Sequence, residues 1–426
     1  MMNEINKLSK NWQVKKLGEI SVEIKPGYPS GQHNSEGKGF LHFRPYNISS
    51  LGNIDLSLKK HVPLKSDNYF LLEGDIVFNN TNSPELLGKT CYINKTAGWV
   101  FSNHMTRIRV NNELSPKYCA LYLHFLFYKG YYRENCANHV NQASISSTFL
   151  SKYIDLPFPP FQDQLKIVSK IEELFSELDK GIESLKMAQQ QLKKYRQAVL
   201  KWAFEGKMTN ENVKEGELPE GWKEIKFGDL FSESPQNGIY KPSTAYGSGT
   251  LIVRIDGFYN GVILADYNYK RLKVTQEEMK QYQISAGDIL INRVNSMPYL
   301  GKCGIVKSLK EKTVFESNIM KIKIKKEISL PEFYTMFLSS KKGTIELRKN
   351  AKQAVNQASI NQTDVSNALV PYCSLAEQLI VVQSIESSLS VIDKMEESIN
   401  QSLKQAEVLR LSILKRAFEG KLITNN

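Results

Sequence analysis

The chain contains two copies of one sequence plan, and this duplication limits the folds it can adopt more than any other feature. Val140–Ile145 returns letter for letter as Val355–Ile360, 215 residues later. Phe204–Lys207, which reads Phe-Glu-Gly-Lys, returns 214 residues later as Phe418–Lys421. Offsets of this size are those of a duplicated domain, because solenoid repeats span only about 20–50 residues. The sequence therefore predicts two similar copies related by a pseudo-two-fold axis.

Each copy begins with a stretch of mixed α and β character, residues 1–160 and 211–372. Gly74–Asn79 and its counterpart Gly287–Asn292 predict a turn followed by a strand. A helix is expected after Pro116 and again after Pro331, because proline is tolerated in the first helical turn. These patterns indicate an α+β fold with two similar globular domains.

The second part of each copy, residues 161–210 and 373–426, predicts one long helix. Neither stretch contains proline between its first turn and a closing glycine, and aliphatic side chains recur at heptad spacing. Such a stripe is typical of a coiled coil. Because a globular domain lies between the two helices, the chain can return and pair them antiparallel; the alternative is that each helix covers only its own domain. The residues expected to pair the helices are Ile171, Leu178, Ile182, Leu185, Leu192, Val199, Ile385, Ile392, Ile399, Leu403 and Ile413.

The charge of the chain favours a polyanionic partner. Lys and Arg number 56 against 44 Asp and Glu, a net charge of +12, and most of this excess lies on the two globular parts. Nucleic acid is the first candidate and a membrane surface the second, although scattered surface lysines would give the same totals.

Several polar residues at strand ends are candidates for contact with double-stranded DNA. Arginine can bind guanine, and asparagine can bind adenine, through two hydrogen bonds each. Asparagine also forms turns by bonding its own backbone, so a structural role is the alternative for every one of them. Asn80 aligns with Arg293, a difference that favours base reading, whereas Lys89 and Lys302 repeat and favour phosphate contact. The candidates are Arg44, Asn79, Asn80, Asn82, Lys89, Arg254, Asn292, Arg293, Asn295 and Lys302.

No pattern of catalytic or metal-binding residues stands out. Gly88-Lys89-Thr90 resembles the end of a phosphate-binding loop, but Ser83 occupies the place of the earlier glycine. The six histidines and five cysteines show no metal-ligand spacing. We expect no catalytic residue, no metal site and no cofactor in this chain. The start has no apolar leader, so we also expect a cytoplasmic protein that is not held in a membrane.

The duplicated plan resembles the specificity subunit of type I restriction–modification systems. The resemblance rests on Val140–Ile145, on the Pro-Pro turn of Leu156–Leu165 that leads into a long helix, and on Phe204–Lys207 at its end. Copy two departs from this pattern, since Val370–Leu375 has only one proline. The departure bears on where the second long helix starts rather than on the architecture.

The resemblance implies a non-catalytic subunit with two target recognition domains. Each domain would read one half of a split, asymmetric DNA site, and the two helices would set the unread spacer. Methyltransferase subunits would dock on the helices with S-adenosylmethionine, and translocase–nuclease subunits would bring ATP and magnesium. Two other classes remain open: a coiled-coil scaffold without DNA specificity, and a nuclease whose active site shows no familiar motif.

Overall fold

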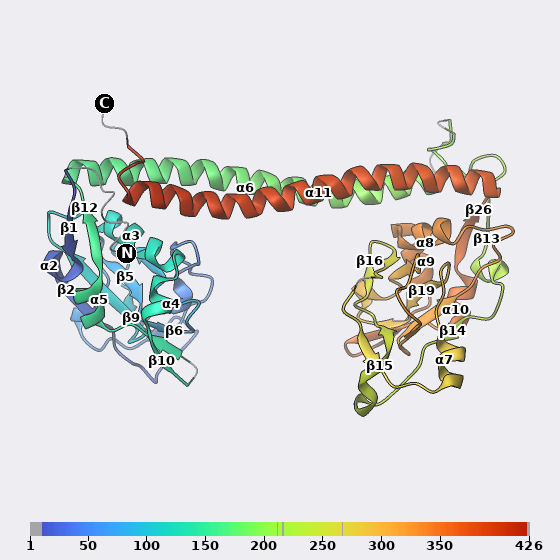
Figure 1. Cartoon of the computed structure of the whole chain (residues 1–426), viewed down its shortest axis with the longest axis horizontal. Coiled ribbons are helices and arrows are strands. Elements are labelled where there is room, and N and C mark those ends of the chain that lie inside the picture. Colours follow the sequence, from blue (N-terminus) through green and yellow to red (C-terminus); the bar gives the residue numbers. More distant parts are fainter. Residues whose placement is uncertain (1–10, 141, 211, 215–216, 266, 424–426) are drawn as a thin grey trace. The chain divides into compact units, whose positions relative to one another are not determined.

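The chain, described here as a computed structural model, divides into two compact units (Figure 1). The structure describes residues 11–140, 142–210, 212–214, 217–265 and 267–423. Unit 1 comprises Met1–Lys186 with Asn400–Asn426, and unit 2 comprises Met187–Ile399. This division runs through both long helices, whereas the sequence placed its domain boundaries at the helix ends. Each unit therefore consists of one globular head and parts of both helices.

Head 1 is built from small, mostly antiparallel sheets. Its strand orders are β2-β9-β5-β7, β4-β3-β8, β10-β11-β6 and β1-β12. The strands are β1 (Gln13–Lys16), β2 (Ser21–Pro26), β3 (Phe40–Phe43), β4 (His61–Val62), β5 (Ile76–Asn79), β6 (Thr81–Asn82), β7 (Thr90–Tyr92), β8 (Val100–Phe101), β9 (Met105–Val110), β10 (Ala137–His139), β11 (Gln142–Ser144) and β12 (Asp155–Phe158). The helices are α2 (Leu17–Ile20), α3 (Pro116–Tyr128), α4 (Tyr131–Asn135) and α5 (Ser147–Tyr153).

Head 2 repeats this plan with one added hairpin. Its strand orders are β14-β23-β19-β21-β17-β16, β18-β15-β22, β20-β25-β24 and β13-β26. The strands are β13 (Lys223–Lys226), β14 (Gln236–Asn237), β15 (Tyr246–Val253), β16 (Phe258–Tyr259), β17 (Val262–Ile263), β18 (Lys270–Leu272), β19 (Ile289–Asn292), β20 (Val294–Asn295), β21 (Cys303–Ile305), β22 (Thr313–Phe315), β23 (Ile319–Ile322), β24 (Lys352–Ala354), β25 (Gln357–Ser359) and β26 (Leu369–Tyr372). The helices are α7 (Gln276–Tyr282), α8 (Pro331–Ser339), α9 (Lys341–Arg348) and α10 (Gln362–Asn367).

The turn-and-strand motifs and the proline-started helices lie where the sequence predicts them. Gly74 and Gly287 adopt φ of 93° and 94°, a left-handed conformation that glycine reaches without steric cost, and each precedes a fully buried strand, β5 or β19. Pro116 and Pro331 open α3 and α8. In each unit this helix lies between the sheets and the long helices (Figure 1).

The long helices are α6 (Phe161–Phe204) and α11 (Leu375–Phe418), and both start at the same buried anchor. Gln164 accepts a hydrogen bond from the backbone N–H of Ser115 (2.7 Å), the residue before α3. Gln378 accepts one from the N–H of Leu330 (2.9 Å), the residue before α8. Both amides are fully buried. The start of α11 is thus fixed by Gln378 despite the missing second proline.

Within each unit, α6 and α11 pair antiparallel around one arginine. In unit 2, Arg196 of α6 lies 2.5 Å from Asp393 and 3.4 Å from Glu396 of α11. Further along α6, Phe204 belongs to the core cluster that includes Ile385 of α11. Residues later in α6 therefore meet residues earlier in α11, which shows that the two helices run antiparallel. In unit 1, Arg410 of α11 forms an ion pair with Asp179 and lies over the ring of Phe175. The fold is therefore α+β, internally duplicated, with two long helices that pair antiparallel.

The last turn of each long helix packs on the head of its own unit. Phe418, at the end of α11, contacts the rings of Tyr118, Tyr122 and Phe125 on α3, with centroids 5.0–5.4 Å apart. Phe204, at the end of α6, makes the equivalent contacts with α8 in unit 2. The repeated Phe-Glu-Gly-Lys sequence therefore fastens each helix end to a head, and the glycine that follows has a φ of 73° in both copies.

One helix is long and apolar enough over an 18-residue window to cross a membrane, and it is α11. The stripe of α11 that carries Ile385, Ile392, Ile399 and Ile413 is buried against the rest of the protein. A core helix passes the same length and composition test as a membrane span, so this feature is weak evidence for a membrane.

Candidate nucleic-acid interface

In head 1, a chain of backbone hydrogen bonds joins four segments that are far apart in sequence. Arg44 directly follows β3, and the N–H of Ser102 donates to the carbonyl of Phe43 (3.0 Å). The N–H of Asn80, between β5 and β6, donates to the carbonyl of His104 (3.0 Å). The carbonyl of Asn80 in turn accepts from Ile145 (3.0 Å), at the end of the β10–β11 hairpin. We call these segments, residues 44, 80–82, 102–104, 140 and 142–145, rim 1.

Head 2 makes the same bonds at the same positions. Glu316 donates its N–H to the carbonyl of Val253 (3.0 Å), and Arg293 donates to Asn318 (2.9 Å). Ile360 donates to the carbonyl of Arg293 (2.9 Å), which joins the β24–β25 hairpin to the corner between β19 and β20. We call residues 254, 293–295, 316–318 and 355–360 rim 2. The two rims have one backbone plan and different side chains, as two modules that bind related ligands of different sequence require.

Three of the asparagines predicted to contact DNA lie inside the fold, which corrects their assignment. Asn79 and Asn292 are fully buried, and Asn79 donates to the carbonyl of Leu86 (2.8 Å). Asn80 donates to the carbonyl of Asn103 (3.1 Å) and to the hydroxyl of Thr106 (2.9 Å). The amides of Asn79 and Asn80 hold loops together, whereas the amide of Asn292 lies enclosed without a hydrogen-bond partner. None of the three faces solvent, so base contact is not available to them.

The two repeated lysines hold loops as well. Lys89 is buried, and its ammonium group donates to the carbonyls of Pro45 (2.9 Å) and Ile48. Burial also lowers the pKa of Lys89. Lys302 donates to the carbonyl of Phe258 (2.8 Å) but is exposed. Lys89 thus holds the loop that follows β3, and Lys302 holds the segment that follows β15, which is a structural reason for the repetition of the two lysines. Phosphate contact stays a prediction for Lys302 alone.

Asn82, Asn295 and Arg293 remain in reach of a ligand. The two asparagines are half-buried, and each accepts a hydrogen bond from the N–H of the next serine (2.8 Å). This bond uses one lone pair of the amide oxygen and fixes the amide at the strand end. Arg293 is half-buried and donates to the carbonyl of Ser317 (3.0 Å).

The clearest electrostatic difference between the rims lies at Arg44 and Arg254. Arg254 forms an ion pair with Glu316 (3.2 Å), whose other oxygen accepts from the N–H of Ile255 (2.8 Å). The residue that aligns with Glu316 in head 1 is Ser102, which carries no charge. Among the described residues, no carboxylate lies within ion-pair distance of Arg44. Rim 1 thus presents an unneutralised guanidinium where rim 2 presents a neutralised pair.

Neutral histidines surround Arg44. The Nε2 atom of His33 accepts from a guanidinium nitrogen of Arg44 (2.9 Å) and lies 3.0 Å from Nδ1 of His42. The pKa of His42 is lowered to about 4, chiefly by burial and in addition by the neighbouring His33 and Arg44. Burial also lowers the pKa of His33 and of His104. The imidazoles are therefore uncharged at neutral pH, and the positive charge of this site is that of Arg44.

The sequence did not single out the residues around the two arginines. Glu316 pairs with Arg254, and Ser102 takes the equivalent backbone position in head 1. An alignment of the two copies around β8 and β22 would have matched these two residues. His33 and His42 showed no metal spacing, and nothing in the sequence alone brings them to Arg44. In the sequence, Val140 and Val355 stand out only as the first residues of a repeated segment.

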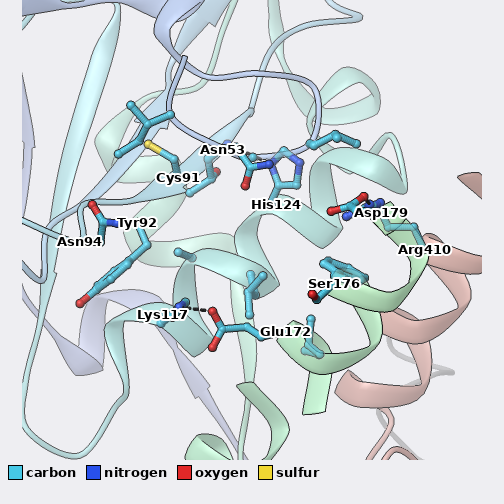
Figure 2. Close-up of a pocket in the computed structure, with 18 of the residues that line it drawn as sticks. Asn53, Cys91, Tyr92, Asn94, Lys117, His124, Glu172, Ser176, Asp179 and Arg410 are labelled. Atoms are coloured by element: carbon cyan, nitrogen blue, oxygen red, sulfur yellow. Dashed lines mark hydrogen bonds and ion pairs between the residues drawn. The ribbon is translucent and has the colours of Figure 1, made fainter. Parts of the chain in front are cut away.

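A separate groove lies within unit 1 between the head and the long helices (Figure 2). Its volume is about 910 Å³, and Asn53, Cys91, His124, Lys117 and Glu172 lie around it. Lys117 pairs with Glu172, and burial holds the pKa of the Cys91 thiol far above its usual range. Both ring nitrogens of His124 are engaged, one by the N–H of Thr90 (3.1 Å) and one by the carbonyl of Ser50 (3.1 Å).

The groove therefore lacks the parts of a hydrolytic site. No thiolate or free imidazole is available as nucleophile or base. Within the described part of the chain, no group of three or more His, Cys, Asp or Glu side chains is placed to hold a metal ion. Two ion pairs, Lys117–Glu172 and Arg410–Asp179, take up part of the charge that lines the groove.

The residues predicted to pair the helices are buried or half-buried. Ile171, Leu192, Val199, Ile385, Ile392, Ile399 and Ile413 are buried. Leu178, Ile182, Leu185 and Leu403 are half-buried. The half-buried residues of α6 lie between residues 178 and 185, where Leu178, Ile182 and Leu185 line a shallow pocket within unit 1. Their contribution to pairing stays a prediction.

Comparison with known proteins gives a consistent result. The sequence model of the type I restriction modification DNA specificity domain matches residues 9–187 and 219–405. The chain is 28% identical over 272 residues to the EcoKI specificity subunit of Escherichia coli (strain K12), an alignment that covers 63% of this chain and 58% of that protein. It is 26% identical over 384 residues to the StySPI specificity subunit of Salmonella potsdam, covering 89% of this chain and 81% of that protein.

Solved structures share the fold. One solved chain comes from work on the complex assembly and conformational transition of the type I R-M system. It superimposes on this chain with a TM-score of 0.74 at 18% identity, covering 97% of this chain and 99% of that one. The HsdS subunit from Thermoanaerobacter tengcongensis gives a TM-score of 0.56 at 17% identity, covering 97% and 98%. At these identities the likeness shows the fold alone.

Proposed function

Because this chain belongs to the family of type I restriction–modification DNA specificity proteins, we propose that it is the DNA-recognition subunit of such a system. Each head would read one half of a split, asymmetric site through its rim. The observation that carries the proposal is the repeated rim backbone with a different charge at its centre, Arg44 with Ser102 in one head and Arg254 with Glu316 in the other. A shared scaffold with exchanged side chains is what reading two different half-sites requires.

The rims offer different base chemistry. A free guanidinium such as that of Arg44 can donate two hydrogen bonds to guanine in the major groove. A carboxylate such as that of Glu316 can accept from the amino group of cytosine, while Arg254 keeps its charge compensated. The excess of positive charge on the chain supplies the general attraction to phosphate.

The helices would dock the methyltransferase subunits. Large apolar side chains remain exposed on α6 within unit 2, namely Met187, Tyr195 and Trp202. They follow one another at seven or eight residues and so lie along one helical face. An exposed apolar face on a helix whose other face is already paired is typical of a protein-binding surface. S-adenosylmethionine would be held by those subunits, and ATP and magnesium by the translocase–nuclease subunits of the same cytoplasmic complex.

Sequencing of methylated sites tests the proposal. The chain is co-expressed with its methyltransferase partner, and then again after residues 1–160 are replaced by those of a relative. We expect a bipartite methylated motif, of which the exchange alters one half-site only. A change in both half-sites, or in neither, would contradict the assignment of one head to one half-site.

Two other functions are separated by simple measurements. A scaffold without DNA specificity would bind cognate and scrambled duplexes equally. A nuclease would cleave DNA by itself when Mg²⁺ is added. We favour neither, because the rims differ in charge where a scaffold needs no difference, and because the described acidic residues form no metal cluster.

A further inference from the structure

The tips of two equivalent β-hairpins each carry one valine that is almost entirely exposed. Val140 stands between β10 and β11, and Val355 stands between β24 and β25. In both hairpins the last paired residues enclose a two-residue loop, and valine is its first residue. Both side chains are 92% exposed, more than any other large apolar side chain of the described chain. The second loop residue of the second hairpin, Asn356, has a φ of 72°; Asn141 lies outside the described residues.

Neither burial nor turn formation explains these valines. Tight turns favour Gly, Asn, Asp, Ser and Pro, whereas a β-branched residue fits a strand. A valine in solvent also gains nothing from the hydrophobic effect. The residue nevertheless stands at the tip of both hairpins, where it begins the repeated segment Val140–Ile145 or Val355–Ile360, although the residues before it differ between the copies. An exposed valine at the same turn position in both hairpins, against the usual residue preference of tight turns, indicates a ligand that both heads share.

The surroundings of the hairpins favour DNA as that ligand. No Asp or Glu occurs between Glu134 and Asp155, nor between Glu346 and Asp364, in a chain that contains 44 acidic residues. Exposed amides and a cation flank the valines, namely Gln142 in head 1 and Lys352, Gln353 and Gln357 in head 2. A hairpin sequence without carboxylates, polar in both heads and with Lys352 in head 2, suits a polyanion and not a typical protein partner.

Backbone pairing places each hairpin beside the strand end that carries a candidate base-reading asparagine. Ala143 pairs with Asn82, and Ala358 pairs with Asn295, so each hairpin belongs to one three-stranded sheet with the rim. Figure 1 shows β10 at the end of head 1 that is remote from α6 and α11. A hairpin that projects from a rim can enter a groove of the duplex that the rim faces.

We propose that Val140 and Val355 insert into a groove of the bound DNA, as an apolar contact that both heads make whatever half-site they read. This inference rests on the proposed function, since it assumes that the rims face DNA. Apolar side chains that enter a groove act as wedges against base pairs and do not depend on a particular base. The valines would thus add affinity and orientation, while Arg44, Arg293 and the other polar rim residues would supply the sequence preference.

Substitution by serine tests the contact. Val140→Ser and Val355→Ser keep a small side chain in an exposed turn, so both variants should unfold at the same temperature as the original chain. Binding is measured by anisotropy with a labelled cognate duplex and with a scrambled duplex, over a series of salt concentrations. In the proposed complex each valine side chain is buried against DNA, and serine would not gain the free energy of this apolar burial. We therefore expect each variant to bind both duplexes about tenfold more weakly. The salt dependence should stay unchanged, because no phosphate contact is removed.

A matched control is Val22→Ser. Val22 is a valine of β2 that is 69% exposed and lies outside rim 1. It should leave both affinities unchanged. A second measurement places 2-aminopurine at successive positions of the cognate duplex; the original chain should raise its fluorescence near each half-site, and the serine variants should abolish the rise on their own side.

The outcomes separate this inference from the proposed function. If the original chain prefers the cognate duplex and both serine variants bind it equally well, the groove contact is refuted and DNA recognition stands. If the serine variants keep their DNA affinity but no longer assemble with the methyltransferase subunits, the hairpins are protein contacts and the inference is again refuted. If the original chain shows no preference between duplexes, it is the proposed function that fails.

Discussion

Acidification should unfold unit 1 before unit 2, because all six histidines of the chain lie in residues 1–160. Burial lowers the pKa of His42 and of His124 from 6.5 to about 4 in the folded protein. In His124 the geometry explains this directly. One ring nitrogen accepts from the N–H of Thr90, and a proton added there would face that N–H. Folding therefore requires both rings to be neutral.

The sign and size of the effect follow from linkage. The unfolded chain binds these protons below about pH 6.5 and the folded chain only below about pH 4, so stability is lost as the pH falls through this interval. At about pH 5 each histidine would cost about 2 kcal/mol, or about 4 kcal/mol together. That is a large part of the about 5–15 kcal/mol that stabilises a typical domain.

Hydrogen exchange of the full chain, resolved by peptide, measures both units in one sample. The quantity compared is the exchange rate of the most protected amides of α3 and β7 divided by that of the most protected amides of α8 and β21, after correction for intrinsic rates. This ratio should be about a thousandfold larger at about pH 5 than at about pH 7.5. His124→Gln is the matched variant, because its amide can make both hydrogen bonds of the ring without titrating. It should reduce the ratio to about thirtyfold. An equal change in both units, or no effect of His124→Gln, would refute the reasoning.

Three further predictions concern recognition and the helices. Arg44→Ala should weaken binding to the cognate duplex by about 1–3 kcal/mol and relax the base preference at one position of one half-site. Titration against single-base variants of the duplex would show this. An equal loss of affinity for a scrambled duplex would reassign Arg44 to phosphate contact or folding. Leu192→Ala, at a side chain 8% exposed, should destabilise unit 2 by about 2–5 kcal/mol in denaturant titrations, and the half-buried Leu185→Ala should cost less. One added heptad in both helices should lengthen the unread spacer by about 10 Å, or about three base pairs, in the methylated motif; an unchanged spacer would show that the helices do not set it.

The architecture could be predicted from the sequence because its signals are local and repeated. The duplication, the Gly-Asp strands and the heptad stripes each depend on spacing within one segment, and each reappears 210–215 residues later. The start of α11 was less certain, because a proline was missing. The structure shows that a buried amide, Gln378, defines that start through contacts with the segment before α8.

The site could be predicted only in part, because burial and partners depend on contacts far apart in sequence. Asn79 and Asn292 had the right chemistry and the right place after a strand, but the strand ends inside the head, so their amides bind backbone or lie enclosed. Lys89 repeats for a structural reason, which a comparison of copies cannot tell from a functional one. Arg44 and Arg254 look alike in sequence, and only the fold reveals that Glu316 neutralises one of them.

The packing of the end of α11 on head 1 has a consequence for how the protein is made. Ile413, Leu414 and Phe418 belong to the core of unit 1, yet they are translated after the whole of head 2. Head 1 is thus synthesised before head 2 but completed after it, while α11 supplies its contribution to unit 2 some thirty residues earlier, at Val381–Ile385. Truncation of the chain before Ile413 would destabilise head 1, because the rings of Tyr118, Tyr122 and Phe125 would lose their contact with Phe418. Only a chain translated through Phe418 can bury them.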